Sequence, residues 1–235
     1  MKIAIIGCDY VDPEQVPLFG EYPDMFRSTL SELRYDLEFT DFDALRGQLP
    51  DISSSFDGYI ITGSRYNSYD NDPWILKLLE WIQYADQARI KVAGICFGHQ
   101  LIARALGAQV HKSTKGWGLG KTQVQVAQFP NWVTTKRNQL RLWVSHQDQV
   151  ETKPPGCKVI AQSDFCPYFM LAKDRHIFTI QGHPEFLKGY TQYLLSKHEN
   201  KLTPEGFDKA TTSLEGTVDS KVVLQWILDL FSLNE

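Results

Sequence analysis

Hydrophobic residues are arranged differently in the two halves of the chain. In the first half, short continuous apolar runs alternate with segments whose apolar residues recur every three or four positions. The runs predict buried strands at 2–7, 35–41, 57–62 and 90–95. The spaced segments predict helices at 23–33, 73–88 and 99–106. This alternation is typical of an α/β fold, a mostly parallel open sheet flanked by helices on both faces.

In the second half, apolar and polar residues alternate with a period of two. Short strands are predicted at 120–127, 139–145, 158–163, 167–173 and 176–181. Such strands favour a small antiparallel extension of the main sheet. The tail, 189–235, predicts two helices joined by the polar stretch 200–218. Because no linker-like segment interrupts the chain, we expect a single domain over residues 1–235.

Composition and charge exclude several classes of function. The 235 residues carry a formal net charge of −4, so a basic surface for nucleic acid is not expected. No apolar run approaches the roughly 20 residues of a membrane-spanning helix, and the N-terminal MKIAIIGCDY predicts a first strand rather than a signal peptide. The four cysteines form no C-x-x-C pair, and no spacing suits a metal site. We therefore expect a cytoplasmic protein without disulfides, metal or cofactor.

Residues 94–100, GICFGHQ, combine a cysteine with a sharp turn. They follow a predicted strand and open a predicted helix, which is the context of a nucleophile elbow with cysteine in place of serine. Gly94 and Gly98 are required there because side chains beside so sharp a turn would collide with the neighbouring strand and helix. Cys96 is expected at the carboxyl edge of the sheet, where the helix N-terminus favours thiolate over thiol. The Phe97 N–H is predicted to point towards a tetrahedral oxyanion.

A cysteine nucleophile needs a nearby imidazole, and His183 has the most suitable context. It follows the strand predicted at 176–181 and precedes Pro184, which favours an extended backbone. In an extended chain residues i and i+2 point to the same side, so Glu185 is expected beside the His183 ring. One ring nitrogen then bonds the carboxylate, and the other is left for the thiol. Without the elbow, an ordinary His-Pro-Glu surface turn would be the simpler interpretation.

The other histidines and cysteines are assigned to different positions. His99 lies in the first turn of the predicted helix, where its direction is wrong for a base, whereas His146 in the loop SHQDQ could line the site. Packing or surface positions are predicted for His111, His176 and His198. Packing is also predicted for the remaining thiols, those of Cys8, Cys157 and Cys166.

Two glycine-containing loops offer backbone groups. Residues 60–64, IITGS, end a predicted strand, so the N–H of Gly63 or Ser64 is a candidate second oxyanion donor, with an ordinary Gly-Ser loop as the alternative. The stretch 115–122, KGWGLGKT, is not a phosphate loop, because Lys115 stands where the first glycine should be and a strand follows. We expect it to be a packing device or a wall of the substrate pocket.

The motifs GICFGHQ, ITGS and QGHPEF together resemble the class I glutamine amidotransferases, over about residues 40–190. The resemblance implies a flavodoxin-like α/β fold. It makes Cys96 the nucleophile, His183 the base and Glu185 the carboxylate that orients the base. Further matching positions are the oxyanion donors Gly63, with Ser64 beside it, and Phe97, and the glutamine-binding residues Gln100, Ser145 and His146.

Within this family, the chain is most similar to two free-standing groups. Many synthetase-linked members have Gly-Gly where this chain has Gly63-Ser64, which matters little because the backbone makes the contact. ITGSRYNSYDNDPWILKLLEW, CFGHQLIARALGA and KGWGLG resemble free-standing GMP synthase-like amidotransferases and the plant γ-glutamyl peptidases, and no synthetase domain is expected to follow. The resemblance implies cysteine-dependent hydrolysis of a γ-glutamyl amide, either glutamine or a γ-glutamyl peptide, through a γ-glutamyl thioester.

Four functional interpretations stay open. The chain is expected to be a self-contained hydrolase of a small γ-glutamyl substrate, with an ammonia-donating subunit of a separate synthetase as the first alternative. A catalytically silent binding or regulatory protein and a cysteine peptidase of the related α/β superfamily are the others; a homo-oligomer is compatible with each. For a hydrolase, the loops 65–72 and 113–120 are expected to hold the leaving group through Arg65, Tyr66, Lys115 and Trp117, although solvated loop residues are the alternative for each.

Overall fold

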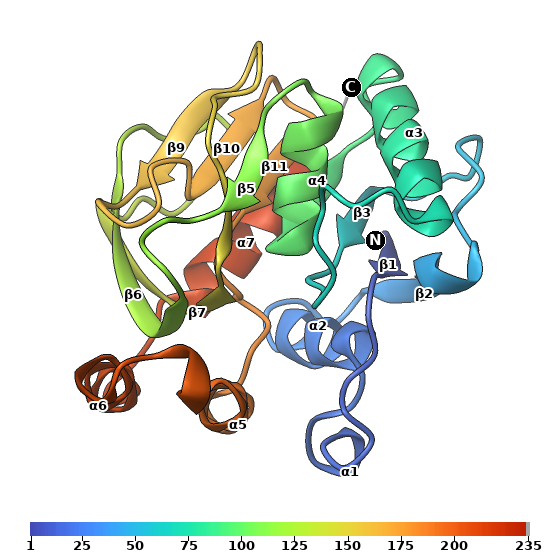
Figure 1. Cartoon of the computed structure of the whole chain (residues 1–235). Helices are drawn as coiled ribbons and strands as arrows, with labels where there is room; N and C mark the ends of the chain where they lie inside the picture. Colours follow the sequence, from blue (N-terminus) through green and yellow to red (C-terminus); the bar gives the residue numbers. More distant parts are fainter. Residues whose placement is uncertain (234–235) are drawn as a thin grey trace.

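A nine-stranded sheet forms the centre of the molecule (Figure 1), which is a computed structural model describing residues 1–233. The strand order is β2-β1-β3-β4-β11-β10-β9-β6-β7. Five strands are parallel: β2 (Glu38–Asp43), β1 (Lys2–Gly7), β3 (Gly58–Ile61), β4 (Val92–Ile95) and β11 (Ile177–Ile180). The antiparallel strands are β10 (Met170–Lys173), β9 (Lys158–Gln162), β6 (Gly118–Val126) and β7 (Gln139–His146). A separate antiparallel pair joins β5 (Val110–Lys112) to β8 (Asp148–Val150).

Helices cover both faces of the central parallel strands because β1, β3, β4 and β11 are apolar on both sides. Ile3 and Ile5 of β1 pack with α2 (Tyr22–Ser31) and α7 (Ser220–Phe231), whereas Ala4 and Ile6 pack with α3 (Pro73–Gln87) and α4 (Phe97–Ala105). The remaining helical segments are α1 (Val16–Phe19), η1 (Ala44–Arg46), α5 (Lys188–Lys197), η2 (Glu199–Lys201) and α6 (Pro204–Ser213). The α/β fold and its antiparallel extension are therefore as the sequence predicted.

The sequence prediction is wrong for the polar stretch 200–218. This stretch contains η2 and the whole of α6, so three α-helices rather than two follow residue 187. In α6 only Ala210 is buried, and so the segment lacks the apolar stripe by which a helix is recognised. The sequence nevertheless contains a signal for the start of α6. The Thr203 hydroxyl accepts a hydrogen bond from the Gly206 N–H at 3.1 Å, and a proline is the first residue of the helix.

Smaller differences concern short or exposed strands. The strand predicted at 35–41 lies at Glu38–Asp43, on the sheet edge where none of its residues is buried. The three-residue strands β5 and β8 were not predicted, because so short a segment shows no period. Within residues 1–233, no helix combines the length and the apolar character needed to cross a bilayer.

The topology brings the candidate residues to one edge of the sheet. The parallel strands β1, β3, β4 and β11 all end there, so the segments that follow them lie side by side. Strand β7 of the antiparallel part also reaches this edge, since the carbonyl of Trp143 in β7 accepts a hydrogen bond from the His183 N–H at 2.9 Å. Helices α5 and α6 pack against the β6–β7 pair and complete the wall beside this edge.

Candidate active site

Cys96 occupies a strained turn between β4 and α4. Its backbone has φ 51° and ψ −100°, a region that residues with a side chain rarely adopt. The turn is held on both sides, since Cys96 N–H donates to the Ile180 carbonyl at 2.8 Å and Gly98 N–H donates to the Thr62 carbonyl at 3.2 Å. The side chain is only 5% exposed, at the N-terminus of α4. This is the sharp strand–helix turn that the sequence predicted.

The glycines around Cys96 are required for steric reasons. A Cβ atom on Gly94 would lie 2.5 Å from Ile102 Cδ1 and 2.7 Å from the Gly98 carbonyl oxygen. A Cβ atom on Gly98 would lie 2.4 Å from the carbonyl oxygen of Ile61 in β3. Both distances to backbone oxygen are far below ordinary contact, so α4 can approach β3 and β4 this closely only with glycine at both positions.

His183 is locked in place beside Glu185 and Phe186. Its Nδ1 lies 2.7 Å from Glu185 Oε1, and its ring stacks on Phe186 with a centroid distance of 3.8 Å and an interplanar angle of 7°. The Glu185 side chain is fully buried. Burial by itself would lower the pKa of His183, but the Glu185 carboxylate and then Cys96 raise it to about 10. The site therefore favours an imidazolium next to Cys96.

The backbone of Gly63 lies against both side chains. A Cβ atom there would be 2.8 Å from His183 Cε1 and 3.6 Å from Cys96 Cβ. Among residues 1–233, no group accepts a hydrogen bond from the N–H of Gly63, Ser64 or Phe97, and so these amides are available to a ligand. The Ser64 hydroxyl is already used, because it accepts from the Tyr66 N–H at 3.1 Å.

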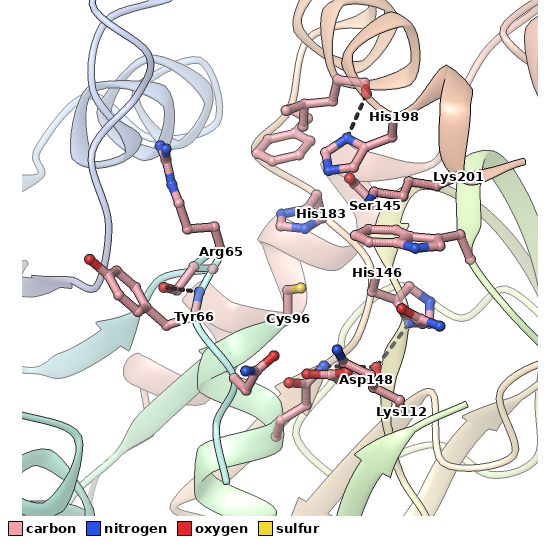
Figure 2. Close-up of a pocket in the computed structure, with 18 of the residues that line it drawn as sticks. Arg65, Tyr66, Cys96, Lys112, Ser145, His146, Asp148, His183, His198 and Lys201 are labelled. Carbon is pink, nitrogen blue, oxygen red and sulfur yellow. Dashed lines mark hydrogen bonds between the residues drawn. The ribbon is translucent and has the colours of Figure 1, made fainter. Parts of the chain in front are cut away.

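A cavity of about 350 Å³ opens above Cys96 (Figure 2). That volume lies in the range of sites for small molecules, roughly 300–1,000 Å³. All of the predicted substrate-binding positions, Gln100, Ser145 and His146, line it together with Gly63, Ser64, Cys96 and His183. Residues lining it that the sequence analysis did not select include Tyr22, Lys112, Asp148, Phe186, Leu194, His198 and Lys201.

His146 is near the base but differs from it electrostatically. Its Nδ1 donates to the Asp148 carbonyl at 3.1 Å, and burial, opposed only in part by this hydrogen bond, lowers its pKa to about 4. His146 is therefore neutral, whereas His183 favours the charged form. The Asp148 side chain lines the same cavity, and its pKa is raised by burial.

The leaving-group residues named from the sequence divide into two groups. Tyr66 and Trp117 line the cavity, and so does Arg65, but the Arg65 guanidinium binds the buried Asp9 at 2.9 Å and points away from Cys96 (Figure 2). The prediction for Lys115 is wrong, because its ammonium bonds the Asp164 carbonyl outside the cavity. Lys112 and Lys201, which the sequence analysis did not name, also line the cavity.

His198 packs against its neighbours, as predicted, but it also lines the cavity, which was not predicted. Its Nδ1 donates to the Leu194 carbonyl at 2.8 Å, and its ring lies 4.6 Å from that of Trp117. This contact joins the end of α5 to the loop before β6, and no local sequence pattern encodes a contact between segments about 80 residues apart. His99, as expected, does not face the cavity: it is fully buried against Thr179, at 2.8 Å.

The other three thiols are buried and lie outside the cavity, as expected for packing residues. Burial raises the pKa of each, to about 11 for Cys157, to about 12 for Cys166 and further for Cys8. All four cysteines are free thiols. Within residues 1–233, no group of three His, Cys, Asp or Glu side chains is arranged to hold a metal ion.

Gln181 was not selected from the sequence, although it directly precedes Gly182 and His183. It follows β11, which pairs in parallel with β4, and so it lies beside Cys96. Its Nε2 is 3.5 Å from Cys96 Sγ, and its Oε1 accepts from Gln100 Nε2 at 3.1 Å. Gln100 Nε2 also donates to the Asp148 carbonyl at 2.9 Å.

Comparison with known proteins identifies the family to which the chain belongs. Residues 19–199 match the sequence profile described as "Glutamine amidotransferase class-I". Gamma-glutamyl peptidase 3 of Arabidopsis thaliana is 32% identical over 219 residues, which cover 88% of this chain and 86% of that protein. A glutamine-hydrolysing GMP synthase of Finegoldia magna is 31% identical over 178 residues, 71% of this chain but 34% of that longer protein.

The fold is shared with solved structures as well. The crystal structure of a glutamine amidotransferase from Methylobacillus flagellatus superposes with a TM-score of 0.75, covering 98% of this chain and 92% of that one. The two sequences are 22% identical, so the likeness concerns the fold.

Proposed function

Because the chain belongs to the class-I glutamine amidotransferase family, we propose that it hydrolyses a γ-glutamyl peptide through a thioester on Cys96. The observation that carries the proposal is the convergence, beside one cavity, of a strained cysteine, a buried histidine–carboxylate pair and the amides of Gly63, Ser64 and Phe97, for which residues 1–233 offer no acceptor. Strain, a raised histidine pKa and free N–H groups serve no purpose in packing, which argues against a silent binding protein.

The first half of the reaction forms the thioester. Cys96 Sγ, as thiolate, attacks the γ-carbonyl carbon, and the carbonyl oxygen becomes an oxyanion that accepts hydrogen bonds from the Phe97 and Gly63 amides. The imidazolium of His183 then gives its proton to the departing amine nitrogen as the C–N bond breaks. The γ-glutamyl group remains on sulfur, and His183 is left neutral with Nδ1 bonded to Glu185.

The second half releases glutamate. A water molecule attacks the thioester carbon, and neutral His183 takes its proton. The C–S bond breaks, which restores the thiolate of Cys96 and the imidazolium of His183. Glu185 stabilises the imidazolium each time it forms, since the carboxylate is fully buried and lies 2.7 Å from Nδ1.

The α-substituents of the glutamyl group are proposed to lie against β7 and β8. Gln100 already donates both amide hydrogens, so its Oε1 is left to accept from an α-ammonium group. The Asp148 carboxyl group lines the same region and suits the same positive charge. Ser145, on β7, lines the same cavity and offers a hydroxyl to the α-carboxylate.

The leaving group is proposed to be an amino acid or peptide rather than ammonia alone. A γ-glutamyl group fills only part of the 350 Å³ cavity, and the remaining wall carries Trp117, His198 and Lys201. Trp117 and His198 form an aromatic pair, and the Lys201 ammonium has no ion-pair partner within residues 1–233. This combination suits an organic group that ends in a carboxylate. The similarity to a protein named gamma-glutamyl peptidase supports the same class of substrate.

The second candidate is an ammonia donor for a separate synthetase, which the similarity to a GMP synthase favours. The two candidates differ in what the purified chain does alone. We expect mass-resolved product analysis to give a higher kcat/KM for γ-glutamyl peptides than for glutamine. Inertness towards every γ-glutamyl peptide, with ammonia release from glutamine only after a synthetase is added, would establish the subunit instead.

A further inference from the structure

The carboxamide of Gln181 contacts the sulfur of Cys96 from the side of β11. The Gln181 side chain is fully buried, and its Nε2 lies 3.5 Å from Sγ, an ordinary distance for a hydrogen bond to sulfur. The contact follows from the sheet, because β4 and β11 run in parallel with Ile95 opposite Ile180. The residue after each strand, Cys96 or Gln181, therefore meets the other at the same edge.

Two hydrogen bonds beyond Gln181 determine which end of its carboxamide faces Cys96. The Asp148 carbonyl can only accept, so the end of Gln100 that lies 2.9 Å from it is the NH₂ group. The second hydrogen of that NH₂ group is donated to Gln181, at 3.1 Å, and the receiving atom must be the Gln181 oxygen. The Gln181 NH₂ group is then the end that faces Cys96.

The same carbonyl prevents the reverse arrangement. It also accepts from His146 Nδ1 at 3.1 Å, so both of its lone pairs are used. If the Gln100 carboxamide rotated by 180°, its oxygen would face the oxygen atoms of Asp148 and Gln181. The hydrogen bonds from Gln100 to Asp148 and to Gln181 would then both be lost. Both carboxamides are buried, so water could not replace the lost hydrogen bonds.

We propose that Gln181 is a further catalytic residue, whose N–H stabilises Cys96 Sγ as thiolate, and that Gln100 is the positioning residue that keeps this N–H turned to sulfur. Sulfur carries negative charge before it attacks the substrate and again when it leaves the thioester. A donor held against it favours the charged form at both stages. The donor is a neutral amide, so it cannot lose its proton to the thiolate as His183 can.

The role of this contact in hydrolysis rests on the proposed function, but the contact can be tested without substrate. Iodoacetamide reacts with thiolate, so the alkylation rate of Cys96 against pH reports how readily the sulfur ionises. Gln181→Met keeps the volume and removes the donor. We expect the midpoint of the rate profile to rise by about one pH unit, the size expected for losing a hydrogen bond to a charged group. Gln181→Glu places a negative charge beside sulfur, and its midpoint is expected to rise further.

Two more variants complete the test. Gln100→Met frees the Gln181 carboxamide to turn, so its midpoint is expected to rise by less than that of Gln181→Met. Gln149→Met is the matched control, because this buried glutamine on β8 has no hydrogen bond to Cys96, and its profile should equal that of the wild type. Peptide mapping identifies the labelled thiol, and circular dichroism confirms that each variant is folded.

An unchanged midpoint in folded Gln181→Met would overturn the proposed contribution of the N–H, and an unchanged midpoint in Gln100→Met would overturn the positioning role. Because iodoacetamide carries no glutamyl group, neither outcome depends on whether the chain hydrolyses γ-glutamyl peptides. A shifted profile together with inertness towards all such peptides would contradict only the proposed function.

Discussion

Gly63 lies so close to His183 that a Cβ atom at position 63 would be 2.8 Å from the imidazole Cε1. Two further contacts set the position of the imidazole, because Phe186 stacks on its face at 3.8 Å and Glu185 holds Nδ1 at 2.7 Å. The packing that supplies a backbone amide to the site thus also sets the position of the proposed base.

This contact predicts the effect of Gly63→Ala. The added methyl group displaces His183 without straining the backbone, since Gly63 is not among the residues of positive φ. A displacement of about 1 Å lowers kcat by roughly 100-fold. Gly7→Ala is the control, because its Cβ atom would make only ordinary contacts, at 3.6 and 3.8 Å. Equal kcat values for the two variants would show that the position of His183 is not limiting.

His183 and His146 are expected to respond differently to removal. His183→Ala removes both the proton donor and the base, so its loss of kcat should approach that of Cys96→Ala, and the double variant should lose little more. His146→Ala should act mainly on KM, because His146 is neutral and touches the substrate region. Steady-state kinetics on one γ-glutamyl peptide separates the two, and a large kcat loss confined to His146→Ala would mean that the wrong histidine has been chosen.

Glu185→Gln tests how the imidazolium is maintained. Burial lowers the pKa of His183, whereas Glu185 and then Cys96 raise it to about 10. Glutamine keeps an oxygen for the Nδ1–H but removes the charge, so the pKa of His183 should fall. The alkaline limb of kcat/KM, where His183 loses the proton meant for the leaving amine, is expected to move down by more than about one pH unit.

The raised pKa of His183 also predicts how the free energy of unfolding changes with pH. The folded pKa of His183 lies above its ordinary value of 6.5, so the contribution of the pair is complete below pH 6.5 and is lost as the pH rises through about 10. Denaturant titration of the wild type should show the free energy of unfolding falling over this window, and the fall should be smaller in Glu185→Gln. An alkaline limb and a stability profile that both stay unchanged would exclude Glu185 as the source of the shift.

Lys201 and Lys115 form a matched pair for testing the leaving-group wall. Both are exposed lysines near Trp117, but only Lys201 lines the cavity. Lys201→Ala should raise KM for a γ-glutamyl peptide by up to about fivefold, the size of an exposed ion pair, and leave KM for glutamine unchanged. Lys115→Ala should change neither constant. An equal rise for glutamine would place Lys201 at the glutamyl group instead of the leaving group.

The elbow and the histidine–carboxylate pair could be predicted because their determinants are local. Gly94 and Gly98 flank Cys96 within five residues, and Pro184 sets the backbone that places His183 and Glu185 on one side. The fold could be predicted for the same reason, since in the parallel half most strands are continuous apolar runs and the longer helices repeat their apolar residues every three or four positions. Helix α6 could not, because with only Ala210 buried it has no apolar stripe.

The rest of the site depends on contacts between distant segments. Gln181 reaches Cys96 only because β11 is inserted beside β4, and the two residues are separated by 85 positions. His198 and Lys201 reach the cavity only because α5 and η2 pack beside Trp117. Lys115 was chosen for its position in the loop, but the direction of its side chain is set by the Asp164 carbonyl.

The central claim is that Cys96 carries the γ-glutamyl group, and trapping that group tests it most directly. The chain is mixed with a γ-glutamyl peptide, quenched in acid within the first turnover and examined by intact-protein and peptide mass spectrometry. We predict a γ-glutamyl adduct on Cys96, absent from Cys96→Ala, whose turnover is abolished. Undiminished hydrolysis by folded Cys96→Ala, or an adduct on Cys8, Cys157 or Cys166 in its place, would contradict the account.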